Sequence, residues 1–173
     1  MTTVTTYIAL LRAVNVGGTG KLPMAHLKNL CQRLGFTNVE TYIASGNVVL
    51  DSDGSERDVK ATLEAALEEY AGKPVGVIVR TGPEMAGVLE GNPFAEGAPN
   101  RTVAIFLDRP TTARMLEGVS GRDGEEIALG RREIYVLYGA GMGRSKLKIP
   151  AAAGGTARNL NTVAKLAAMA ERR

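Results

Sequence analysis

The sequence predicts an α+β protein built from two similar halves, each an antiparallel sheet covered by helices. Over the first half, short apolar runs and helical stripes follow one another in the order β-α-β-β-α-β. A less regular series of the same kind follows a loop at 91–97 that contains glycine and proline. The length of 173 residues suits one compact domain or two small packed halves.

The first half has clear start and stop signals for each predicted element. Pro23 is tolerated in a first helical turn, where its missing N–H would have no partner, and Gly35 is placed to end that helix. Ser45-Gly46-Asn47 is a tight-turn sequence between two short strands, and Gly72 and Pro74 end the second helix. The expected elements are a strand at 6–14, a helix at 24–34, strands at 39–44 and 48–51, a helix at 56–70 and a strand at 75–80.

This order is that of the ferredoxin-like split βαβ unit, an antiparallel sheet with both helices on one face. The second half repeats it as a short helix at 84–89, strands at 101–107, 126–129 and 133–138, a short helix at 111–117 and a final helix at 161–171. We therefore expect two ferredoxin-like α-β plaits, the second degenerate because it lacks its last strand. One continuous α+β domain is the alternative. The predicted parts are a ferredoxin-like half at 1–82, a short helix and linker at 83–99, and a plait-like half with a basic C-terminal helix at 100–173.

Composition narrows the class of protein. One cysteine permits no internal disulfide, and one cysteine with one histidine excludes the usual Cys/His zinc sites, so no metal or cofactor is predicted. The first apolar run has no basic leader and is interrupted by Arg12, so it is typical of a strand and not of a signal peptide. No apolar stretch approaches the ~20 residues that span a bilayer. We expect a soluble, cytoplasmic protein without a membrane partner.

Charge is distributed unevenly along the chain. From Arg131 onward there are nine Lys/Arg and two acids, whereas the preceding residues carry 12 basic and 16 acidic side chains. A basic C-terminal part favours an anionic small molecule or a nucleic acid as partner. The alternative is a solvated surface whose cations pair with the acidic part of the chain.

A glycine-rich loop with basic and amide side chains follows the first strand. Glycines let backbone amides approach a ligand, and the flanking donors favour an anion. The loop is not a Walker A motif, because Leu22 follows the lysine and supplies no hydroxyl for magnesium. The alternative is a crossover loop in which the arginine bonds backbone carbonyls. The candidate ligands of an anion here are Arg12, Asn15, Gly17, Gly18 and Lys21.

Three later segments supply further candidates for the same anion site. In Gly143–Lys146, two cations and a hydroxyl follow flexible glycines, a composition that suits phosphate or carboxylate binding. Arg158 stands near the start of the final helix, where an anion contact is favourable, although its amide neighbours also suit helix capping. Hairpin conformation alone is the favoured explanation of the Ser45–Asn47 turn, although its hydroxyl and amide could also reach an anion at the end of the sheet. The candidates are Ser45, Asn47, Arg144, Ser145, Lys146, Arg158, Asn159 and Asn161.

Five blocks of the sequence together form a recognisable pattern: Thr5–Pro23, Leu34–Val49, Asn92-Pro93-Phe94, Gly143–Leu147 and Thr156–Leu166. This pattern resembles a bacterial family known only as domain of unknown function 1697. The resemblance implies a pair of α/β plaits and no activity. The chain departs from the family pattern at Ala13, where glycine is common, and at Leu160, where tryptophan is usual. The stretch before the last block, IPAAAGGTA, is short and rich in alanine.

These observations support three hypotheses about function. The first is a binding protein for a nucleotide, a phosphorylated metabolite or a nucleic acid. The second is an enzyme acting on a phosphate- or carboxylate-bearing small molecule, with Ser45 or Ser145 as the chemical group, although no general base is identifiable. The third is a protein-interaction module, because plait sheets expose a face or an edge. The sequence leaves the oligomeric state undetermined.

Overall fold

A computed structural model describes residues 3–12, 22–43, 46–139 and 142–173. It contains two antiparallel four-stranded sheets, which confirms the expected α+β class. The chain forms two compact units: the first comprises residues 1–85 and 166–173, and the second comprises residues 86–165. The divisions fall inside the helices α3 (Gly82–Glu90) and α4 (Leu160–Glu171).

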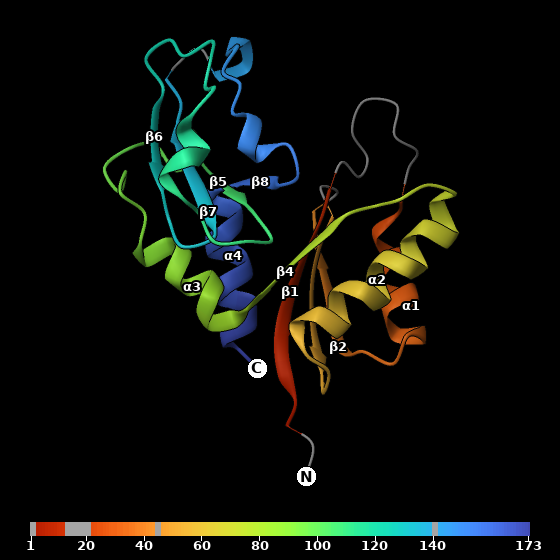
Figure 1. The fold of residues 1–173 in the computed structure, drawn as a ribbon. Helices are drawn as coiled ribbons and strands as arrows, with labels where there is room; N and C mark the ends of the chain where they lie inside the picture. The colour runs from red at the N-terminus through yellow and green to blue at the C-terminus, as the bar shows by residue number, and fades with distance from the viewer. Residues whose placement is uncertain (1–2, 13–21, 44–45, 140–141) are drawn as a thin grey trace. The chain divides into compact units, whose positions relative to one another are not determined.

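The first unit follows the expected order of elements. Its sheet has the strand order β2-β3-β1-β4, with β1 at the centre paired to both β3 and β4. The glycines predicted to end the helices do so, since Gly35 and Gly72 have φ values of 95° and 73°. The elements are β1 (Thr5–Leu11), α1 (Met24–Arg33), β2 (Thr37–Tyr42), β3 (Asn47–Ser52), α2 (Glu56–Ala71) and β4 (Val77–Thr81) (Figure 1).

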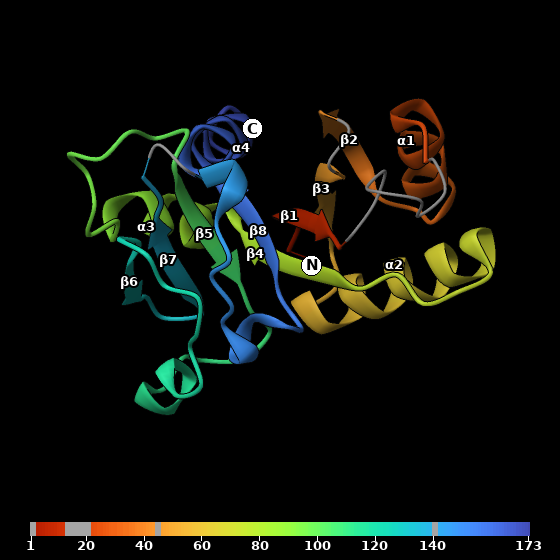
Figure 2. The same cartoon turned by 90° about the horizontal axis from the view of Figure 1, so that it is seen from above.

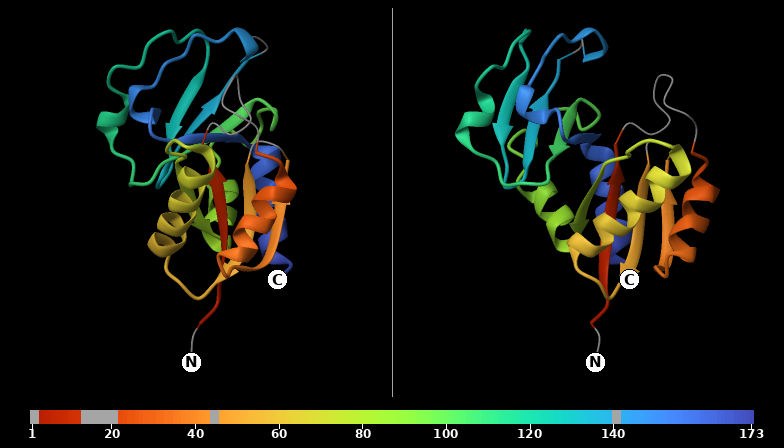
Figure 3. Two further views of the ribbon diagram at one scale, coloured as in Figure 1. Left: turned by 90° about the vertical axis from the view of Figure 1, so that its right-hand side faces the viewer. Right: turned by 45° about the vertical axis from the view of Figure 1, so that its right-hand side comes forward.

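Helices α1 and α2 cover one face of this sheet (Figure 2). Alternate strand residues such as Ala9, Leu50 and Val79 pack there against Leu27 and Leu63 of the helices. Figure 3 shows the two helices side by side along the strands. Burial of these apolar side chains is the main source of stability for the first unit.

The C-terminal part of α4 is attached to the opposite face of the first sheet. Leu50 belongs to the helix-covered core, so its neighbour Asp51 points to the other face. Arg173 Nη1 lies 3.1 Å from Asp51 Oδ1, and Arg173 Nη2 lies 3.2 Å from Glu40 Oε1. Thr6 Oγ1 and Asn38 Nδ2 each donate to the Asp51 carboxylate at 2.7 Å. Burial favours the neutral acid, but these hydrogen bonds and the Arg173 charge outweigh it and lower the pKa of Asp51.

The second unit has a sheet with the corresponding strand order, β6-β7-β5-β8. The prediction that its last strand is missing was wrong, because Thr156–Asn159 forms β8 and pairs with β5. The helix expected at 111–117 is a single 3₁₀ turn, η1. The elements between α3 and α4 are β5 (Thr102–Phe106), η1 (Ala113–Leu116), β6 (Glu126–Leu129), β7 (Glu133–Leu137), the 3₁₀ turns η2 (Met142–Arg144) and η3 (Pro150–Ala152), and β8.

Short turns cover one face of the second sheet. Ile105 and Val136 point to this face and pack with Met115 of η1 and with Leu147 and Ile149, which lie between η2 and η3. Tyr135 points to the opposite face, because the side chains of successive strand residues alternate. Its hydroxyl donates to the backbone carbonyl of Val88 in α3 at 2.7 Å.

Candidate functional site

The second unit contains a pocket of about 610 Å³. Its walls come from the residues just before β6 and from the residues that follow β7, so both loops start or end at neighbouring strands of the sheet. Loops held on a rigid sheet are common positions for binding sites. The lining residues are Gly121, Arg122, Asp123, Glu125, Tyr138, Gly139, Met142, Arg144, Ser145 and Lys146.

Backbone contacts join the two walls. Ser120 and Lys148 exchange hydrogen bonds, with Ser120 N donating to Lys148 O at 3.0 Å and Lys148 N donating to Ser120 O at 2.8 Å. Gly121 has a φ of 69°, and a Cβ atom there would lie 2.0 Å from the carbonyl oxygen of Lys146. Only glycine therefore fits this close approach of the two segments.

Glu125 joins the walls through its side chain. Its carboxylate accepts hydrogen bonds from the hydroxyl of Ser145 and from the backbone N–H of Asp123. The hydrogen bond from Ser145, then the backbone N–H groups and the charge of Arg122, lower the pKa of Glu125. Ser145 Oγ also accepts from Leu147 N at 3.2 Å. Ser145 thus fixes the backbone on which its two basic neighbours stand.

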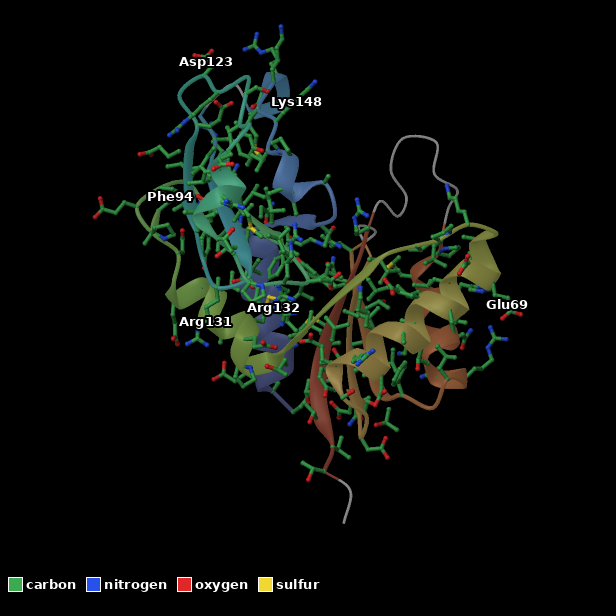
Figure 4. All side chains as sticks on the ribbon, in the orientation of Figure 1. Glu69, Phe94, Asp123, Arg131, Arg132 and Lys148 are labelled. Carbon is green, nitrogen blue, oxygen red and sulfur yellow. The ribbon has the colours of Figure 1, made fainter. Side chains whose placement is uncertain are left out.

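Those basic neighbours, Arg144 and Lys146, are exposed and both line the pocket. Within the described residues, neither side chain forms an ion pair, and the nearby Glu125 carboxylate accepts hydrogen bonds from Ser145 and Asp123 N. Arg122 Nε donates to the Glu125 carbonyl at 2.7 Å, which holds a third cation at the rim. Three cations and two carboxylates give the lining a net positive charge. Figure 4 shows Asp123 and Lys148 at the same end of the second unit.

Tyr138 and Met142 give the pocket an apolar wall. Both are half-buried and pack against the core formed by Ile105 and Val136. Tyr138 is fixed at its backbone, because its N–H donates to Arg101 O at 2.9 Å. Burial first, and then the charge of Glu125, raise the pKa of Tyr138, so its hydroxyl stays protonated at neutral pH.

Arg158, a predicted anion ligand, lies on the other face of the second sheet. It pairs with Ala104 and so shares the side of the sheet opposite to Ile105 and the pocket. Its side chain is buried, and Nη1 donates to Thr156 Oγ1 at 2.7 Å and to Ala157 O at 2.9 Å. Burial lowers the pKa of Arg158 to about 10.

Three of the four predicted asparagines lie in the described residues, and they have separate positions. Asn159 caps α4, since its Oδ1 accepts from Thr162 N at 2.9 Å. Asn161 is exposed in the first turn of that helix. Asn47 is fully buried and donates from Nδ2 to Tyr42 O at 2.8 Å, which closes the β2–β3 hairpin.

The N-terminal loop lies largely outside the described residues, and so do the predicted ligands Asn15, Gly17, Gly18, Lys21 and Ser45. Arg12 is described: it follows β1 in the first unit, and its N–H donates to Gly76 O at 2.9 Å. A Cβ atom at position 76 would lie 3.0 Å from Arg12 Cδ, so the arginine stem passes directly over Gly76.

Seven of the ten pocket residues were not predicted, among them Arg122, Glu125 and Tyr138. Charged residues and glycines alternate in Gly121–Glu125, and this composition predicts a turn. It does not indicate which distant segment the turn contacts. Glu125 meets Ser145 only through folding, because 20 residues separate them.

Other functional groups are scarce in the part of the chain that the structure describes. It contains no group of His, Cys, Asp and Glu side chains that could hold a metal ion. None of its helices combines the length and apolar character needed to cross a membrane. Cys31 is buried in the first core, and burial raises the pKa of its thiol to about 12, so it is not a reactive nucleophile.

Comparison with known proteins identifies one family and one similar solved structure. The chain is similar to a solved structure described as conserved bacterial protein SP0830 from Streptococcus pneumoniae, with a TM-score of 0.80 and 25% sequence identity over 97% of this chain and 99% of that chain. No curated protein matches it. Residues 4–135 match the family described as protein of unknown function (DUF1697). The chain therefore belongs to the DUF1697 family.

Proposed function

We propose that this protein binds an anionic small molecule in the pocket of the second unit, through Arg144 and Lys146. The observation that carries the proposal is that both cations line one pocket of about 610 Å³, in which three cationic side chains outnumber two carboxylates. Charge-assisted hydrogen bonds from such cations to a phosphate or carboxylate are among the stronger polar contacts in proteins.

The pocket supports binding better than catalysis by Ser145. A catalytic serine needs a base that takes its proton, and within the described residues the group that accepts from the hydroxyl is Glu125. The pKa of Glu125 is lowered, which makes it a weaker base than an ordinary glutamate. Because Ser145 Oγ also accepts from Leu147 N, its role is to hold the loop.

Calorimetric titration with inorganic phosphate and pyrophosphate tests the proposal. We expect saturable binding by the wild type, weakening as salt is added because the contacts are ionic. Arg144→Ala and Lys146→Ala should each reduce affinity about tenfold, which corresponds to about 1.4 kcal/mol for one lost charge-assisted contact.

A double variant with the same net charge provides the matched control. Arg114 and Arg131 are exposed in the second unit and do not line the pocket. Arg114→Ala with Arg131→Ala should leave affinity within about twofold of the wild type, whereas Arg144→Ala with Lys146→Ala should abolish binding. Equal losses in the two double variants, or no binding by the wild type, would contradict the proposal. Binding of a single-stranded oligonucleotide but of neither phosphate would favour a nucleic acid as ligand.

We also propose that both units are ferredoxin-like plaits that arose by duplication. The support is the equivalent strand order, β2-β3-β1-β4 in one unit and β6-β7-β5-β8 in the other. A helix follows the last strand in each series, α3 after β4 and α4 after β8. In the second unit, η1 stands at the place of α1, and η2 and η3 stand at the place of α2.

A further inference from the structure

We infer that the ligand of the second-unit pocket carries a flat aromatic group next to its anionic group, as a nucleoside monophosphate or an aryl phosphate does. The inference rests on the proposed function and assigns to it a class of ligand. Its basis is the coexistence in one pocket of a basic segment, Arg144–Lys146, and an apolar wall, Tyr138 with Met142.

The size of the pocket exceeds what a simple oxyanion needs. A single phosphate replaces only a few water molecules of about 30 Å³ each, whereas this pocket measures about 610 Å³. Pockets of roughly 300–1,000 Å³ are typical of sites that bury an organic ligand. The remaining space therefore suits an organic group attached to the anion.

The lining of that space favours a flat ring. Gly139 contributes no side chain to the walls and nothing lies within 4 Å of the place of its Cβ, so the surface next to Tyr138 is open there. Aromatic and thioether side chains bind ring systems by stacking and by sulfur–ring contacts. Tyr138 is held in place by Arg101 O at its backbone and by the core behind it, so little freedom is lost when a ring packs on it.

The polar groups beside the apolar wall can form hydrogen bonds with the polar edge of such a ligand. The phenolic hydroxyl of Tyr138 is a hydrogen-bond donor at neutral pH. The carboxylate oxygens of Glu125 each hold one hydrogen bond within the described residues, and a carboxylate has capacity for about four. A sugar hydroxyl or a ring amino group can therefore be accepted without displacing Ser145 or Asp123 N.

Titrations with four probes separate the ring from the anion: inorganic phosphate, ribose 5-phosphate, phenylphosphonate and adenosine monophosphate. We expect the two compounds with an aromatic ring to bind at least about fivefold tighter than the two without one, the lower end of the effect of base–aromatic stacking. Tyr138→Ala and Met142→Ala should remove most of this advantage and leave the affinity for ribose 5-phosphate unchanged. Tyr138→Phe should retain the advantage, since it keeps the ring.

Tyr70→Ala is the control, because Tyr70 is a 43% exposed tyrosine of the first unit. It should bind all four probes as the wild type does. If Tyr138→Ala fails to fold, Met142→Ala and Tyr138→Phe still carry the test. Equal affinity for adenosine monophosphate and ribose 5-phosphate would overturn the inference and leave anion binding intact. Failure of all four probes to bind would overturn the proposed function as well.

Discussion

The two sheets share one strand order but differ in what covers them. In the first unit, α1 and α2 lie against the face that carries Ala9 and Leu50. In the second, the described residues of the corresponding connections contain 3₁₀ turns and no α-helix, and the core behind Ile105 is completed by Met115, Leu147 and Ile149. Replacing helices by short turns leaves room at the end of the sheet, and the pocket occupies that room. The better-covered unit supplies stability, and the less covered one supplies the candidate site.

The two units also share a detail at the junctions between β4 and α3 and between β8 and α4, which supports the proposed duplication. Arg80 near the end of β4 and Arg158 near the end of β8 are both buried, and each donates from Nη1 to the carbonyl of the preceding residue. The next residues, Thr81 and Asn159, each accept an N–H from the residue three positions later and so begin α3 and α4. The strand-to-helix junction is therefore the same in both units, whereas the connections between strands differ.

The largest expected effect is on the helix-covered core. Leu63→Ala, in α2 and fully buried, should lower the free energy of unfolding by about 2–5 kcal/mol, because it removes apolar contact and leaves a cavity. Met115→Ala, in η1 and 7% exposed, should fall at or below the lower end of that range. Urea unfolding measures both. Leu116→Ala, at a 40% exposed position, is the control and should stay within about 0.5 kcal/mol. If Met115→Ala lost more free energy of unfolding than Leu63→Ala, the core of the first unit would not be the more stabilising of the two.

The next largest effect is expected at the ion pairs that Arg173 forms with Asp51 and Glu40 in the first unit. Asp51→Asn should cost about 1–3 kcal/mol at pH 7, since it removes the charge that Arg173, Asn38 and Thr6 stabilise. The pKa of Asp51 is lowered in the folded protein, so its contribution is complete above the unfolded-state pKa of about 3.9 and is lost as the pH falls through the folded value. The stability difference between wild type and variant should therefore shrink below about pH 4. A difference that stays constant from pH 7 to pH 3 would contradict this assignment.

Two neighbouring glycines test the geometry of the pocket. Gly121 and Gly124 have φ values of 69° and 85°, so alanine is strained at both. Only at Gly121 does the added Cβ meet backbone, 2.0 Å from Lys146 O, whereas nothing lies within 4 Å at Gly124. Gly121→Ala should therefore cost about 1–3 kcal/mol more than Gly124→Ala in thermal unfolding, and it alone should abolish phosphate binding. Equal costs would show that the two walls do not approach as described.

The smallest expected effect is on ionisation within the pocket. Ser145→Ala removes the largest contribution to the lowered pKa of Glu125, so that pKa should rise toward its ordinary value. Carbon-detected NMR of the side-chain carboxyl across a pH titration measures it. Ser120→Ala, at a residue joined to the other wall only through its backbone, should leave the Glu125 pKa unchanged. An unchanged pKa in Ser145→Ala would mean that the two side chains are not bonded in solution.

The sequence predicted the first unit well because its signals are local. The stripe of α1, the Ser45–Asn47 turn and the ends at Gly72 and Pro74 can each be recognised within a few residues. Strand β8 was missed because its four residues contain little apolar character, and only pairing with β5, some fifty residues earlier in the chain, makes them a strand. The strand propensity of these four residues carries no information about their pairing with β5.

The candidate site was predicted in part for the same reason. Arg144 and Lys146 stand in one basic, glycine-flanked segment, so composition alone identified them. Glu125 was missed because its partner Ser145 is distant in sequence. Arg158 was interpreted as an anion ligand because its place before a helix suits one, but β8 directs its side chain to the face opposite the pocket.

The proposed function requires anions to bind between Arg144 and Lys146 in the second unit. An amide NMR titration of the whole chain with phosphate tests it most directly, because it locates the contact in solution. We predict that the largest shifts fall on Gly121–Glu125 and Met142–Leu147, with little change along α1 and α2. Shifts centred on any other surface, with the amides of Arg144 and Lys146 unmoved at saturating phosphate, would contradict the account.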